Sequence, residues 1–235
     1  MKKSHIATLI VFLALIPLTL ILGSRLSGRA FYVTSTLVIV ELLIPFFLAF
    51  EGRRPQAREL VVLAVMCALA VAGRVAIPIP SFKAIFGIIM IAGIAFGPES
   101  GFLVGAISAL ASNFFYSQGP YTPWQMMAYG AGGMLAGFVF ARGRLPRKPV
   151  IMGIFGFLAV TFFVGPLLDT CSVFLVMSRI TLKGAVAFYI SGFPVNLRQA
   201  VATAIVLLVL GKPLLEKLDR IKTKYGILDD GGKEA

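Results

Sequence analysis

The chain has 235 residues, of which 58% are hydrophobic and only 14% are charged, and its formal net charge is +12. A soluble domain carries about 25% charged residues, so this composition excludes an ordinary soluble protein. Several apolar runs approach the roughly 20 residues that cross a bilayer, and a backbone inside lipid must satisfy its own hydrogen bonds. We therefore predict an all-α fold, a polytopic membrane helix bundle.

The N-terminal region contains two apolar runs. Residues 6–22 follow Lys2 and Lys3, but the run is long for a signal peptide and "SRLSGRA" after it lacks a cleavage site, which predicts a retained span. The second run, 31–50, includes Glu41 and Pro45. An intramembrane carboxylate costs about 2.5–3.5 kcal/mol, so we expect Glu41 to face protein.

Eight spans are predicted along the chain. The pair 84–97 and 101–115 is joined by "GPES", which is typical of a tight turn. Segment 169–195 mixes short apolar runs with Arg179 and Lys183, and we interpret it as a structured external loop that can include a half-helix. The predicted spans are 6–22, 31–50, 60–77, 84–97, 101–115, 125–141, 150–168 and 196–212.

The basic residues predict the orientation of the chain in the membrane. With eight spans, fifteen of the 22 Lys and Arg residues lie on the side of the termini and seven on the other side. The positive-inside rule then places both termini in the cytoplasm. Loops 78–83, 116–124 and 169–195 are consequently predicted to be external.

One external stretch, "SNFFYSQGPYTPWQMM" at 112–127, contains no charge but many aromatic and amide side chains. Ligand sites combine apolar and aromatic walls with a few placed polar groups, so the stretch indicates an outward-facing site. Tyr and Trp also serve as interface anchors in membrane proteins generally. That alternative explains Tyr121 or Trp124 alone, but it explains the neighbouring amides poorly.

Small residues recur at four-residue spacing in several spans. Ala64, Ala68 and Ala72 form one stripe on the run 60–77, which favours close helix contact, either inside this protein or with another subunit. The glycine pairs at 93/97, 101/105 and 133/137 repeat the pattern and are interpreted as internal contacts.

From about residue 57 to 226 the chain resembles the substrate-binding S-component of an energy-coupling factor (ECF) vitamin transporter. The matching segments are the Ala64-xxx-Ala68 stripe, "IIMIAGIAFGPESGFLVGAISALASNFF", "GPYTPWQMMAYGAGGMLAG" and "SGFPVNLRQAVATAIVLLVLGKPLLEKLDRIKTKYGI". The resemblance implies a six-helix S-component-like core at 57–226, with the vitamin site formed by loops 77–84, 115–124 and 169–195. The chain departs from that plan by two extra N-terminal transmembrane helices within 1–56 and ends in a polar cytoplasmic tail, 227–235.

The resemblance also implies a function. Such proteins are not enzymes: they sit in the prokaryotic cell membrane, capture a vitamin outside and dock on a transmembrane T-component carried by two cytoplasmic ATPases. It implies that Ala64, Ala68 and Ala72 are the docking surface. The "PWQM"-type loop and the "RIKxKYGI" end look most like the cobalamin-type subgroup, while riboflavin-like and other heterocyclic vitamins stay open.

Two other classes of protein remain as alternatives, a self-contained secondary carrier or channel and an intramembrane enzyme. The only histidine, His5, lies in the N-terminal flank, which argues against a histidine-based catalytic dyad, and no metal site or cofactor is expected. Asp169 is interpreted either as a helix cap or loop-ordering salt bridge, or as a ligand contact or latch. The candidate substrate-binding residues are Phe82, Asn113, Phe115, Tyr116, Gln118, Tyr121, Trp124, Gln125, Tyr129, Asp169, Asn196 and Gln199.

Overall fold

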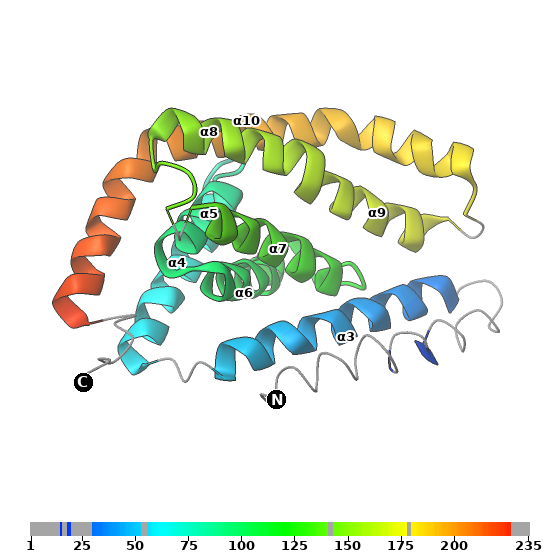
Figure 1. Ribbon diagram of the computed structural model, residues 1–235. Helices are drawn as coiled ribbons and strands as arrows, with labels where there is room; N and C mark the ends of the chain where they lie inside the picture. Colours follow the sequence, from blue (N-terminus) through cyan, green and yellow to red (C-terminus); the bar gives the residue numbers. More distant parts are fainter. Residues whose placement is uncertain are drawn as a thin grey trace.

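The computed structural model describes residues 15, 18–19, 30–52, 56–140, 143–177 and 180–226. Within these ranges the chain is all-α and contains no strand (Figure 1). Because the π-helical turn η2 joins α8 to α9 without a break, the described elements form seven helices. Their bounds are α3 Ala30–Gly52, α4 Ala57–Val75, α5 Ile85–Phe96, α6 Pro98–Tyr116, α7 Thr122–Phe140, α8 Pro149–Ala159, η2 Val160–Val164, α9 Gly165–Val176 and α10 Leu182–Tyr225.

Helices α3 to α7 lie where the hydrophobic runs predicted helices, within a few residues at each end. The predicted first span, 6–22, falls outside the described residues except at positions 15, 18 and 19. Glu41 faces protein as expected, since its Oε1 accepts a hydrogen bond from Thr19 Oγ1 at 2.5 Å.

The expected four-residue turn "GPES" is shorter in the structure. Helix α5 ends at Phe96 and α6 begins at Pro98, so Gly97 alone reverses the direction of the chain. Gly97 has φ 95°, which glycine adopts without steric cost. Pro98 starts the next helix at once because proline is well suited to the first helical position.

The structured loop expected at 169–195 is wrong for most of its length, because the segment is largely helical. Residues 149–176 form one continuous helical rod through η2, and α10 already begins at Leu182. The charged residues suggested a break in the helix, but the carboxylate of Asp169 accepts a hydrogen bond from Asn196 of α10, so the helix continues through it. Helix α10 has 44 residues, about 66 Å at 1.5 Å per residue, and so extends well beyond a hydrocarbon layer of about 30 Å. These two rods, Pro149–Val176 and Leu182–Tyr225, are long and apolar enough to cross a membrane.

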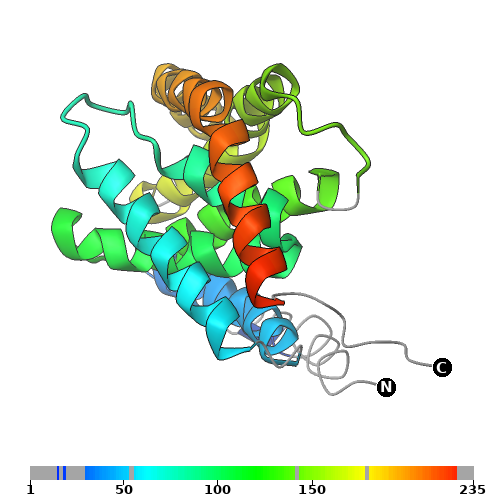
Figure 2. The ribbon, with the colours of Figure 1, turned by 90° about the vertical axis from the view of Figure 1, so that its left-hand side faces the viewer.

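Helix α10 bends so that its last part, drawn orange to red, turns down beside α4 and α5 (Figures 1 and 2). Pro213 lies inside the helix, and proline removes a backbone hydrogen bond and kinks a helix. Beyond the bend, Lys222 Nζ donates to the carbonyl of Ala95 at 2.7 Å. Arg147, which precedes α8, donates through Nη2 to the carbonyl of Ile94 at 3.3 Å. The two cations satisfy carbonyls that the end of α5 would leave unpaired.

Helix α5 forms the centre of the bundle, because every one of its residues is buried. Helices α4, α6, α7, α8 and α10 contact it. The outer surface is unusually apolar: Val61, Phe162 and Ile190 are 64%, 70% and 70% exposed. Apolar exposure on this scale marks a membrane or protein contact surface.

Five of the six paired glycines lie in internal helix contacts, as expected, and the sixth, Gly97, is the turn residue between α5 and α6. A Cβ at Gly93 would overlap the backbone of Gly133, and a Cβ at Gly105 would overlap that of Tyr129. A Cβ at Gly101 would lie 2.5 Å from the carbonyl oxygen of Gly133. Helices α5, α6 and α7 therefore cross at backbone contact distance, which only glycine allows.

This crossing predicts a stability difference between two glycine substitutions. Gly133→Ala would drive a methyl group into backbone atoms of Gly101, whereas Gly211→Ala would meet only the terminal methyl of Met152, at 2.9 Å. Both changes gain similar helix propensity, about 1 kcal/mol. We expect Gly133→Ala to destabilise the protein by about 1–3 kcal/mol relative to Gly211→Ala. Thermal unfolding in detergent measures this, and equal midpoints would contradict the close crossing.

Candidate functional site

A cavity of about 470 Å³ opens between four helices, α4, α7, α9 and α10. Its wall is partly polar and partly apolar, and it includes six of the twelve candidate residues. The six are Tyr121, Gln125, Tyr129, Asp169, Asn196 and Gln199. The other lining side chains are Arg74, Leu168, Cys171, Ser172, Leu175, Val176 and Val195. The wall therefore comes mainly from helices, and it includes no residue of the predicted loop 77–84.

Arg74, near the C-terminal end of α4, is the only cation among the described residues that line this cavity. Its Nη1 donates to Ser112 Oγ at 2.5 Å and to Asn113 Oδ1 at 2.9 Å. The guanidinium carbon also lies 4.9 Å from the ring centroid of Tyr116 and 5.6 Å from that of Tyr129. Hydrogen bonds and cation–π contacts thus fix the orientation of a charge at the cavity wall.

Asn113 lies behind the wall, not on it. It is fully buried, and its Nδ2 donates to Gln125 Oε1 at 2.8 Å and to Thr122 Oγ1 at 3.2 Å. Because the oxygen of Gln125 is engaged in this way, its amide nitrogen is the group that can donate into the cavity. Asn113 therefore links Arg74 to Gln125 and sets the direction of both.

Asp169 lies across the cavity, inside α9. Its Oδ2 accepts from Asn196 Nδ2 of α10 at 2.7 Å. A Cβ at Gly192 would overlap the Asp169 carboxylate, so the glycine gives that carboxylate its space between the helices. Asp169 is not at a helix end, and no ion pair to it is found among the described residues; Arg179 lies outside them. Of the two interpretations of Asp169, the helix-end cap is wrong, and the contact that the described residues show is the amide of Asn196.

Trp124 does not line the cavity. It is 8% exposed and stacks on Phe174, with ring centroids 5.6 Å apart. Its indole Nε1 is buried with no hydrogen-bond acceptor among the described residues. Phe82 is also away from the cavity, half-buried in the connection between α4 and α5.

Tyr116 and Gln118 hold the turn between α6 and α7. The hydroxyl of Tyr116 donates to the carbonyl of Arg74 at 2.9 Å, and Gln118 Nε2 donates to that of Leu110 at 3.0 Å. Thr122 Oγ1 donates to Gln118 Oε1 at 2.9 Å and accepts from the backbone N–H of Gly119. The side-chain amides of Asn113 and Gln118 therefore stabilise the turn between α6 and α7, and they do not line the cavity.

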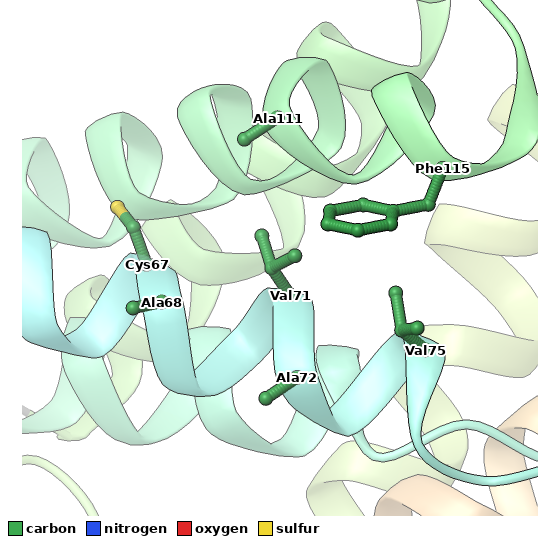
Figure 3. A pocket seen from close by; sticks show the side chains of 7 residues that line it. All are labelled: Cys67, Ala68, Val71, Ala72, Val75, Ala111 and Phe115. Atoms are coloured by element: carbon green, nitrogen blue, oxygen red, sulfur yellow. The ribbon is translucent and has the colours of Figure 1, made fainter.

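Phe115 lies in a second, apolar groove of about 490 Å³ between α4 and α6. Val71 of α4 points toward Ala111 and Phe115 of α6, whereas Ala68 and Ala72 point away from α6 (Figure 3). Ala68 and Ala72 also line the groove, and Ala64, Ala68 and Ala72 are all exposed. The alanine stripe is therefore not used for packing against any described part of this chain.

Arg74 and Ser172 were missed by sequence reasoning. Arg74 was considered only as an outer-side charge, although a lone arginine at the end of an alanine-rich span was a usable signal, because charges at membrane depth are costly and often functional. Ser172 offered no signal without the neighbouring helix. Among the described residues, no group of three His, Cys, Asp or Glu side chains could hold a metal ion.

Comparison with known proteins gives one match. A family model described as "ECF-type riboflavin transporter, S component" matches residues 55–216. No curated protein and no solved structure matches the chain. The matched region contains every residue that lines the cavity and the apolar groove, and it leaves out α3.

Proposed function

Because the chain belongs to the family of ECF-type riboflavin transporter S components, we propose that it captures riboflavin or a closely related flavin in the cavity between α4, α7, α9 and α10. Members of this family are membrane transport components and not enzymes. The observation that carries the substrate proposal is the cavity itself, which has polar groups on α4 and α7 and on the facing α9 and α10, and tyrosines on the α7 side.

The lining chemistry suits a flavin. An isoalloxazine ring carries carbonyl acceptors and an N–H donor on one edge, and its ribityl chain carries hydroxyls. Arg74 and the amide of Gln125 can donate to the acceptors, and the Asp169 carboxylate can accept from an N–H or hydroxyl. Tyr121 and Tyr129 add aromatic surface for a flat ring.

The cobalamin-type expectation has no support in the family match, which is to the riboflavin type. Cavity size argues the same way. About 470 Å³ is in the range for drug-sized ligands and small for a corrin with its nucleotide loop.

The proposed orientation puts the cavity outside the cell and both termini in the cytoplasm. The cavity lies at the C-terminal end of α4. Arg58, Arg144 and Lys217 are exposed toward the opposite end of the helix bundle, where the basic C-terminal end of α10 also lies. Positive residues favour the cytoplasmic side, which leaves the cavity facing outward.

Delivery requires a partner, and we propose that the alanine stripe of α4 with the adjoining apolar groove docks on a transmembrane T-component carried by two ATPases. Small exposed side chains allow a partner helix to approach closely. Val61 and Val65, 64% and 60% exposed, extend the same apolar face.

Riboflavin titration of the purified protein tests the substrate proposal. The chain has a single tryptophan, and Trp124 lies directly behind the cavity wall, so bound flavin should quench its fluorescence. Asp169→Asn keeps the shape but removes the charge, and we expect about tenfold weaker binding because hydrogen bonds to charged groups are the stronger ones. Cobalamin serves as the comparison ligand. Saturable binding of cobalamin but not of riboflavin would contradict the proposal.

A further inference from the structure

Helix α3 lies outside the region that matches the family, yet it packs against the outside of the cavity wall. Ile39, 6% exposed, forms a hydrophobic cluster with Trp124 and Cys171. Tyr121 and Leu175 pack against that cluster. The same helix contacts α6, α7 and α9. Figure 1 shows α3 running below α6 and α7.

The cavity lining and the cluster that includes Ile39 share side chains. Three residues, Tyr121, Cys171 and Leu175, belong both to the cavity lining and to the cluster around Ile39. Thr36, on the same face of α3, also donates to the carbonyl of Pro120 at 3.3 Å, in the turn that carries Tyr121.

Trp124 belongs to the same contact between α3 and the wall. Its indole N–H is buried without an acceptor among the described residues, and such burial is unfavourable. The contacts of its ring with Phe174 and the Ile39 cluster are what keep it in place. Without Ile39 behind it, the wall would gain freedom to move toward the cavity.

We propose that α3 positions the substrate-binding wall, and that Ile39 is the residue through which it acts. Ile39 touches no ligand; it holds Tyr121, Cys171 and Leu175 at their places in the lining. This inference rests on the proposed function only for the identity of the ligand.

The chain offers a matched control on the same helix. Leu43 is also 6% exposed, but it packs on Phe102 and Ala106 of α6, away from the cavity lining. Ile39→Ala and Leu43→Ala therefore both remove buried apolar atoms from the face of α3 that packs on the bundle. Only Ile39→Ala removes them from the cluster that adjoins the cavity lining. Ile39→Val is a milder variant in case Ile39→Ala does not fold.

The first measurement needs no ligand. In a Cys67→Ala background Cys171 is the only thiol, and it is buried in the wall. We expect Ile39→Ala to raise the rate at which a small methanethiosulfonate reagent modifies Cys171 by at least fivefold, Ile39→Val to raise it less, and Leu43→Ala to leave it within twofold.

The second measurement uses riboflavin as the probe. We expect its dissociation rate to rise at least fivefold with Ile39→Ala and to stay within twofold with Leu43→Ala. Equal effects of Ile39→Ala and Leu43→Ala, or no effect of either Ile39 variant on Cys171, would overturn the proposal. If the unmodified protein does not bind riboflavin, the substrate proposal fails, and the thiol measurement still decides the role of α3.

Discussion

Replacing Arg74 with glutamine should lower the affinity for riboflavin roughly 30- to 100-fold, since hydrogen bonds to a charged group are worth about 1.5–3 kcal/mol each. Within the described part of the chain Arg74 is the only cation in the cavity lining, and its guanidinium is held by Ser112 and Asn113. Glutamine can replace neither the charge nor the forked geometry. Isothermal titration of the purified variant measures the loss.

Two comparisons separate ligand binding from a structural role of Arg74. Arg198→Gln removes an exposed arginine of α10 that donates to its own helix at Pro194, and it should bind normally. Arg74 donates to Ser112 and Asn113 through Nη1 and keeps its other nitrogens for a ligand. Arg74→Lys keeps the charge but has a single nitrogen for all these partners, so intermediate affinity is expected. An Arg74→Gln protein that unfolds at a lower temperature but binds riboflavin with unchanged affinity would show that Arg74 serves only the helix contacts.

Much of the helical framework could be predicted because hydrophobic runs in a membrane chain correspond directly to helices. The small-residue pattern also predicted correctly that Gly93, Gly101 and Gly133 lie in internal contacts. Segment 169–195 could not be predicted, since a charge such as Asp169 argues against a helix in lipid until its partner is known. That partner, Asn196, is 27 residues away on another helix.

The sequence indicated which types of residue form the candidate site, but not which of them line the cavity. Gln125, Tyr129 and Asn196 line the cavity, whereas Asn113 and Trp124 lie behind its wall. Composition shows that amides and aromatics gather in one stretch, but the side chain that faces inward depends on helix rotation and on neighbouring helices. Arg74 required the structure for the same reason, because its contacts with Ser112 and Asn113 span 38 and 39 residues of sequence.

The faces of α4 carry the two proposed activities separately. Arg74 faces the cavity, while the alanine stripe is exposed and the buried face is formed by Leu63, Met66 and Ala70. Substrate binding and docking should therefore respond to different substitutions on one helix.

Ala68→Trp should abolish uptake while leaving riboflavin affinity within twofold. Helices pack about 8–10 Å apart, and an indole on the stripe fills the space that a partner helix would occupy. Ala187→Trp, at an exposed alanine of α10 away from the groove, is the matched control and should transport normally. Ala70→Trp, at a fully buried position of the same helix, should instead fail to fold.

Binding is measured on the purified protein and uptake in cells that contain the complete transporter. Normal uptake by both Ala64→Trp and Ala68→Trp would exclude this face of α4 from docking, because neither bulky side chain could then meet a closely packed partner.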